Sequence, residues 1–321
     1  MVSCAISSDG NKIKRALALG KKLRLIEVHN GLSTIIANEA RNVETGLQFD
    51  GVWISSLTST ASFGLPDLDL SIIDSRLSVI EQVTRTSARP VVIDGSTGGD
   101  ASSVVYLCKG LMRFGVSAVI FEDKAYPKRN SLVGSDQQLL DPYEFCEKIA
   151  AGRDAAAKGD LMILARIESL ISGEGLEDAL RRAAIYVSAG AEGILIHSRA
   201  KTASEITLFA RRFSTQYPAV PLFCVPTTYH TERATALFAS GFDAVIYANH
   251  LLRAAHAAME RACVSILTND CSSLIEPEIA STGRIFNDVG YTAEMQRLSE
   301  RSSMLPVRVR FDAVIHGEDV Q

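Results

Sequence analysis

Three acidic residues stand beside short apolar runs of the chain and could together hold a metal ion. Asp94 and Glu122 each end such a run, and Asp67 lies in the segment that follows another. Carboxylate oxygens suit Mg²⁺, which keeps several waters and uses only one or two carboxylates directly. Asp67 alone is better explained as a helix N-cap or a surface acid. The metal interpretation therefore rests on Asp94 and Glu122.

Two basic side chains at the ends of further runs indicate recognition of an anion. Arg166 follows the apolar letters MILA, and its guanidinium fork suits a phosphate or a carboxylate. Glu168 lies on the same side and could brace it, although a purely structural ion pair is the alternative. His197 also ends a run and could donate to an anion or transfer a proton.

A long charged segment, about residues 123–140, follows Glu122. Long loops in compact domains are commonly functional, and many of them act as lids. This one has five side chains that could close on an anionic group: Lys124, Lys128, Arg129, Asn130 and Ser131.

These residues need a scaffold, and the apolar pattern predicts one. Short continuous apolar runs, typical of strands buried on both faces, recur eight times: Leu23–Val28, Val52–Ser55, Pro90–Asp94, Ala118–Glu122, Met162–Ile167, Gly193–His197, Pro221–Val225 and Ala244–Tyr247. Stretches with helical spacing alternate with them, and several end at a glycine, as in Ala189-Gly190 and Ser240-Gly241. This alternation predicts an α/β fold, a (β/α)8 TIM barrel, with the polar strand ends gathered at one rim. An open doubly wound sheet is the alternative, weakened because no Gly-x-Gly-x-x-Gly follows the first run.

Composition excludes several other classes. The 321 residues are 47% hydrophobic and 22% charged, which is ordinary for a globular protein. The net charge of -4, without a basic run, argues against nucleic-acid binding. The sequence has no apolar stretch of membrane-spanning length and no recognisable signal peptide or lipid anchor, so we expect no membrane partner. Six cysteines without a Cys-x-x-Cys pair predict reduced thiols in a cytoplasmic protein.

The C-terminal part differs from the rest. We expect residues 1–270 to form the barrel, with an N-terminal helix, and residues 271–321 to form a helical extension and tail. Helices are expected over Leu251–Leu267 and around Glu294–Arg301, and the alternating segment Val307–Ile315 could be an added strand.

Several motifs resemble the phosphoenolpyruvate mutase branch of the isocitrate lyase superfamily. The strongest is EDKAYPKRNS at Glu122–Ser131, and the others, in the same order as in that branch, are EVHNGLS at Glu27–Ser33, ARIES at Ala165–Ser169, GILIHSR at Gly193–Arg199, VPTTY at Val225–Tyr229 and YANHLLRA at Tyr247–Ala254. The resemblance implies a barrel that binds Mg²⁺ and interconverts phosphoenolpyruvate and phosphonopyruvate. It also implies a homodimer or homotetramer in which the eighth helix is swapped between partners.

The resemblance also implies a role for individual residues. Asp94 would bind the metal ion directly, and Asp67 and Glu122 would bind it through water. Ser96 stands at a fourth metal-binding position. The catalytic set would be Asp67, Lys128, Asn130, Ser131, Arg166 and His197. Substrate would be bound by Trp53, Ser55, Ser56, Leu57, Asp94, Asn130, Ser131, Leu132, Arg166 and His197.

Two positions depart from the family pattern. The third-strand motif usually has a second aspartate where this chain has Ser96, and the loop after Trp53 usually has a glycine where this chain has Ser56. Ser96 carries no charge, so we expect weaker metal binding unless Asp100 compensates. Besides the mutase, the sequence leaves open a phosphonopyruvate hydrolase, another enzyme that acts on keto acids, and a barrel with weakened catalysis. A carbon–carbon lyase is disfavoured because the loop lacks the cysteine typical of those enzymes.

Overall fold

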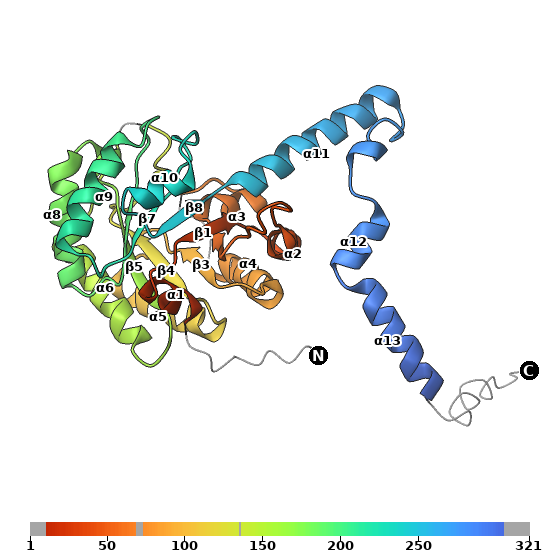
Figure 1. Ribbon diagram of the computed structural model, residues 1–321, viewed down its shortest axis with the longest axis horizontal. Coiled ribbons are helices and arrows are strands. Elements are labelled where there is room, and N and C mark those ends of the chain that lie inside the picture. Colours follow the sequence, from red (N-terminus) through yellow and green to blue (C-terminus); the bar gives the residue numbers. More distant parts are fainter. Residues whose placement is uncertain (1–10, 69–72, 135, 305–321) are drawn as a thin grey trace, which may run out of the picture. The chain divides into compact units, whose positions relative to one another are not determined.

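A computed structural model describes residues 11–68, 73–134 and 136–304 of the chain. Eight parallel strands close into a barrel in chain order, each hydrogen-bonded to the next and the last to the first (Figure 1). The strands are β1 (Leu23–Glu27), β2 (Gly51–Ile54), β3 (Val91–Asp94), β4 (Ala118–Glu122), β5 (Met162–Ile167), β6 (Ile194–Ile196), β7 (Leu222–Cys224) and β8 (Ala244–Tyr247). All eight predicted runs are therefore strands of one barrel.

Helices surround the strands. The sequence predicted these helices less completely than the strands. Those of the barrel unit are α1 (Lys12–Ala18), α2 (Gly31–Glu39), α3 (Ser56–Ser62), α4 (Ile73–Thr86), α5 (Ala101–Arg113), α6 (Pro142–Ala156), α7 (Ser169–Ser172), α8 (Gly175–Ser188), α9 (Ser204–Gln216) and α10 (Ala234–Ala239). The predicted glycine caps are confirmed, since Gly190 and Gly241 have φ of 101° and 109°. Both angles lie in the left-handed region that glycine enters without steric cost.

Two apolar layers explain why the strands read as continuous hydrophobic runs. Side chains such as Leu25, Val92 and Leu164 fill the barrel interior. Their neighbours Val52, Ile93 and Ile163 point outward and pack under the helices. Because both strand faces are covered, polar residues collect where the strands end.

The chain divides into two compact units, Met1–Ala257 and Ala258–Gln321. The division falls within α11 (His250–Asn269), whereas the sequence placed the boundary after residue 270, because the apolar pattern of this helix continues without a break. In the second unit follow the 3-10 turn η1 (Glu276–Glu278), α12 (Thr282–Asp288) and α13 (Tyr291–Met304), which covers the helix expected around Glu294–Arg301. The possible strand Val307–Ile315 lies outside the described residues.

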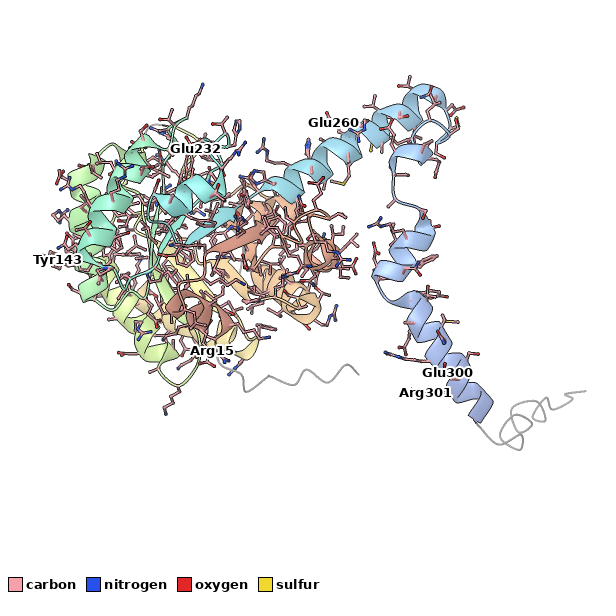
Figure 2. All side chains as sticks on the ribbon, in the orientation of Figure 1. Arg15, Tyr143, Glu232, Glu260, Glu300 and Arg301 are labelled. Carbon is pink, nitrogen blue, oxygen red and sulfur yellow. The ribbon has the colours of Figure 1, made fainter. Side chains whose placement is uncertain are left out.

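Helix α11 has no buried side chain along its described length. Figure 2 shows its side chains projecting outward, Glu260 among them. In the described ranges, no helix is long and apolar enough to cross a membrane. The described cysteines are all free: Cys108 and Cys224 are buried, Cys146 is half-buried, and Cys263 and Cys271 are exposed.

Candidate active site

A single cavity at the carboxyl ends of the strands is lined by all ten predicted substrate-binding residues. Asp67 and Lys128 also line it, and so do five residues that the sequence did not single out as substrate contacts: Leu195, Val225, Thr227, Ala248 and Asn249. Its volume of about 50 Å³ is room for a few water molecules. The loop that follows β4 contributes Lys128, Asn130, Ser131 and Leu132 to this lining. The loop therefore covers part of this cavity, the position expected for a lid.

Asp94 and Glu122 end adjacent strands, and both are buried. Asp94 accepts hydrogen bonds from Ser56 Oγ at 3.1 Å and from the Ser96 amide at 2.8 Å. Burial would raise the pKa of Asp94, but the charges of Lys128 and Arg166 outweigh it and hold the pKa below its ordinary value. Neither carboxylate oxygen of Glu122 has a hydrogen-bond partner among the described residues.

Lys128 enters the site from the loop and lies among the predicted metal-binding groups. Its ammonium donates to Ser56 Oγ at 2.8 Å, to Asp67 Oδ1 at 2.9 Å and to Ser96 Oγ at 2.9 Å. Asn130 Nδ2 donates to the other oxygen of Asp67 at 2.7 Å. Asp67 is thus paired with the loop, and in the described part of the chain no three His, Cys, Asp or Glu side chains form a metal cage. The donors fit Mg²⁺ held by one or two carboxylates and water, because the Glu122 oxygens accept no hydrogen bond from the described residues, although Arg166 and Lys128 lie 3.3 Å and 3.7 Å away.

Arg166 is the centre of a second cluster, which adjoins the carboxylates of Asp94 and Glu122. Its Nη1 lies 3.3 Å from Glu122 Oε2 and 3.5 Å from Asp94 Oδ2, and its Nε pairs with Glu168. Nδ1 of His197 lies 2.9 Å from both Arg166 Nη2 and Glu168 Oε1. Burial and the charge of Arg166 lower the pKa of His197, which favours the neutral imidazole, against the opposing charge of Glu168. The predicted pairing of Glu168 with Arg166 is confirmed.

Two buried charged groups at the site were undervalued by the sequence analysis. Lys124 and Glu168 are fully buried next to Ser131, yet neither was placed in the catalytic set. The indole N–H of Trp53, predicted as a substrate contact, is buried without a partner among the described residues. A lysine directly after a buried strand was a usable signal for Lys124, since lysine is rarely fully buried unless it is paired.

Asp100 does not replace the missing second acid of the third-strand motif. Its side chain caps α5 by accepting a hydrogen bond from the Ser103 amide at 2.7 Å. Ser96 itself has φ of 53°, a left-handed conformation in which Asp and Asn occur more readily than Ser. Exchange of Ser96 for an acidic residue therefore need not strain the backbone.

We expect Ser96→Asp to raise Mg²⁺ affinity at least about tenfold, because a further carboxylate near a divalent cation is worth a few kcal/mol at an effective dielectric constant of about 20. Titration calorimetry with Mg²⁺ alone measures this effect. Ser96→Asn is the matched control, since it has the same shape and tolerates the same backbone conformation without the charge. Equal or weaker affinity in Ser96→Asp would mean that Ser96 belongs to a reshaped site.

Burial raises the pKa of Glu122 from 4.5 to about 7, against the opposing charges of Lys128 and Arg166. Between these two pH values the folded protein retains a proton that the unfolded chain has released. The free energy of unfolding of the metal-free protein therefore falls as pH rises through this window. We expect Glu122→Gln to remove this pH dependence. Between pH 4.5 and 8 the free energy of unfolding of the variant should therefore rise by up to about 3 kcal/mol relative to that of the parent. Urea unfolding in a chelator tests this, and parallel pH profiles would contradict it.

A barrel whose strand ends surround a small cavity with cations and carboxylates defines an enzyme for a small anionic substrate. The family described as phosphoenolpyruvate phosphomutase matches residues 14–267. The phosphoenolpyruvate phosphomutase of Tetrahymena pyriformis is 37% identical over 264 residues, which are 82% of this chain and 85% of that protein.

Solved structures agree with the sequence match. A phosphoenolpyruvate phosphomutase from Streptomyces platensis subsp. rosaceus has a TM-score of 0.83 at 36% identity, covering 90% of this chain and 98% of that one. A phosphonopyruvate hydrolase in complex with oxalate and Mg²⁺ has a TM-score of 0.80 at 32% identity, covering 90% and 97%. The chain belongs to the phosphoenolpyruvate phosphomutase family of the isocitrate lyase superfamily, as its motifs predicted, and is an enzyme of the isomerase class.

Proposed function

We propose that this enzyme interconverts phosphoenolpyruvate and phosphonopyruvate. The observation that carries the proposal is Asn130, which lines the cavity from the loop and donates to Asp67 at 2.7 Å. In the family that the sequence resembles, mutases have an asparagine at this position, whereas the hydrolase branch tends to lack it. The similarity to named phosphoenolpyruvate phosphomutases supports the same activity.

The reaction is an internal rearrangement of one molecule. The bond between phosphorus and the enol oxygen breaks, a bond between phosphorus and the methylene carbon forms, and the enol becomes a ketone, with no water taken up. Transfer of a phosphoryl group passes through a loose, metaphosphate-like state. The protein therefore chiefly positions the reacting groups and neutralises their negative charge. Arg166 and His197 would hold the phosphoryl oxygens, and Asn130 would orient the group while it moves between oxygen and carbon.

Exclusion of water separates this reaction from hydrolysis. Asp67, Asp94, Lys128 and Arg166 line the cavity, and Glu122, Glu168 and Lys124 lie directly behind them in ion-pair contact. The carboxylates of Asp67 and Asp94 line the cavity itself and would repel a trianionic substrate in the absence of a divalent cation. We propose that Mg²⁺ is that cation, held by Asp94 directly and by Glu122 through water, where it would stabilise the enolate.

Phosphorus NMR of the purified protein with Mg²⁺ and phosphonopyruvate tests the proposal. We expect the phosphonate signal to be replaced by that of phosphoenolpyruvate. Release of inorganic phosphate instead would establish the second candidate, a phosphonopyruvate hydrolase, which the similarity to such an enzyme supports. No change, with Mg²⁺ binding retained, would indicate another keto-acid substrate or a barrel with weakened catalysis.

We further propose a homodimer or homotetramer in the cytoplasm, with α11 exchanged between subunits. Helix α11 follows β8 and has no buried side chain over its described length. Its exposed apolar residues include Met259, Val264 and Leu267, with exposed fractions of 58%, 58% and 85%. Burial of these side chains against a second copy would recover the missing hydrophobic stabilisation. The free thiols of the described cysteines suit a reducing compartment.

A further inference from the structure

The hydroxyl group of Ser131 uses its full hydrogen-bonding capacity inside the site. It donates to Glu168 Oε2 at 2.7 Å, and it accepts from Lys124 Nζ at 2.6 Å and from Arg166 Nη2 at 2.9 Å. Ser131 is 3% exposed, so water does not compete for these bonds. A serine hydroxyl has one proton and two lone pairs. In this closed arrangement Ser131 therefore has no lone pair left with which to accept a phosphoryl group.

Lys124 connects the middle of the loop to the two ends of the same loop. It follows β4 directly, and its isolated bridge to Leu139 joins the two ends of the loop. Its ammonium donates to the Arg129 carbonyl at 2.7 Å as well as to Ser131, and it lies 3.5 Å from Glu168 Oε2. At 2% exposure it is the most deeply placed cation of the loop region along with Lys128. Loss of this ammonium would remove the contacts that join Arg129 and Ser131 to the base of the loop, while those of Lys128 and Asn130 to Asp67 remain.

Glu168 is held in place from its other side. Its amide donates to Asp123 Oδ1 at 2.9 Å, and Asp123 is buried and accepts from Tyr186 Oη at 2.7 Å. Arg182 reinforces this support by donating to the Leu140 carbonyl at 2.9 Å, next to the end of the loop. One carboxylate oxygen of Glu168, Oε1, contacts Arg166 and His197. The other, Oε2, accepts the hydrogen bond of Ser131. Glu168 thus joins the substrate-binding cations to the loop.

We propose that Lys124 and Glu168 are positioning residues that make the orientation of Arg166 depend on the insertion of Ser131, and hence on closure of the loop. When Ser131 withdraws, Arg166 Nη2 loses a partner, and Glu168 and Lys124 lose the group they share. The guanidinium would reach its working orientation only once water is shut out. This inference rests on the proposed function, and it divides the two loop residues: Asn130 would serve the moving phosphoryl group, and Ser131 would align Arg166.

The test compares Lys124→Met with Lys124→Arg, which keeps the charge, and with Asp136→Asn. This last variant is the matched control: it removes the exposed Arg129–Asp136 ion pair of the same loop and keeps the trypsin sites at Lys128 and Arg129. Proteolysis of a transiently open segment follows its open population. For Lys124→Met we expect trypsin to cut at these sites at least about tenfold faster than in the parent. We also expect kcat to fall about a hundredfold with KM within about threefold, as for misplacement of a catalytic group by about 1 Å. Lys124→Arg should recover most of the kcat and of the resistance to trypsin that Lys124→Met loses. Asp136→Asn should match the parent in both.

A second variant keeps the proposal testable if Lys124→Met does not fold. Ser131→Ala removes only the shared hydroxyl, and we expect it to lower kcat about tenfold or more and to raise the share of inorganic phosphate among the products. Trypsin cleavage and kcat at the parental level in Ser131→Ala and in folded Lys124→Met would overturn the proposal. If the parent enzyme releases only phosphate, the proposed mutase function fails, while the protease comparison still decides whether Lys124 anchors the loop.

Discussion

Asp94→Asn is expected to lower turnover about a thousandfold, the largest effect we foresee for a single substitution. Asp94 is the buried carboxylate at the end of β3, next to both Lys128 and Arg166. Asparagine keeps its size and its oxygen for the Ser96 amide but removes the charge that would hold Mg²⁺. Removal of one preorganised electrostatic contact to a transition state commonly costs 10²–10³ in rate, and a metal contribution adds several kcal/mol.

The measurement is turnover by phosphorus NMR together with calorimetric binding of Mg²⁺, which should become too weak to detect. Asp100→Asn is the matched control, because Asp100 belongs to the same strand-to-helix connection and asparagine caps a helix equally well. This control should retain both turnover and metal binding. Unchanged turnover in Asp94→Asn would refute the metal assignment of Asp94.

Asn130→Ala is expected to lower mutase turnover by about 10²–10³, with the dissociation constant of the substrate changed less than tenfold. Asn130 faces the cavity from the loop after β4, and we expect its contacts to the phosphoryl group to form mainly while that group is in transit. Interactions made only in the transition state affect kcat rather than binding. The alanine variant also removes the hydrogen bond to Asp67, which weakens closure of the loop.

Turnover and the dissociation constant of phosphonopyruvate, measured on the same preparation, separate these effects. Gln138→Ala is the control, since Gln138 is an exposed amide of the same loop whose side chain contacts only Asp136 among the bonds described. A tenfold or larger loss of binding that matches the loss of turnover would show that Asn130 holds the ground state. Full activity in Asn130→Ala would remove the main support for the mutase assignment.

The elements of the fold were largely predictable because they depend on local pattern. Eight apolar runs became eight strands, since a strand covered on both faces must be apolar along its whole length. Short helices were harder: α3 and α7 have 7 and 4 residues, too few to show a helical period. The boundary of the second unit was also not visible, because α11 is one uninterrupted helix and only contacts with the rest of the chain divide it.

The sequence by itself determined which residues gather at the site. A parallel barrel brings the carboxyl end of every strand to one rim, so Asp94, Glu122, Arg166 and His197 had to meet once the strands were recognised. Tertiary structure alone decided which of them pair. Lys128 reaches across to Asp67 and Ser96, and Ser131 inserts between Arg166 and Glu168. These contacts depend on the path of a loop without regular structure, and loop paths are set by long-range packing and charge, which no local pattern encodes.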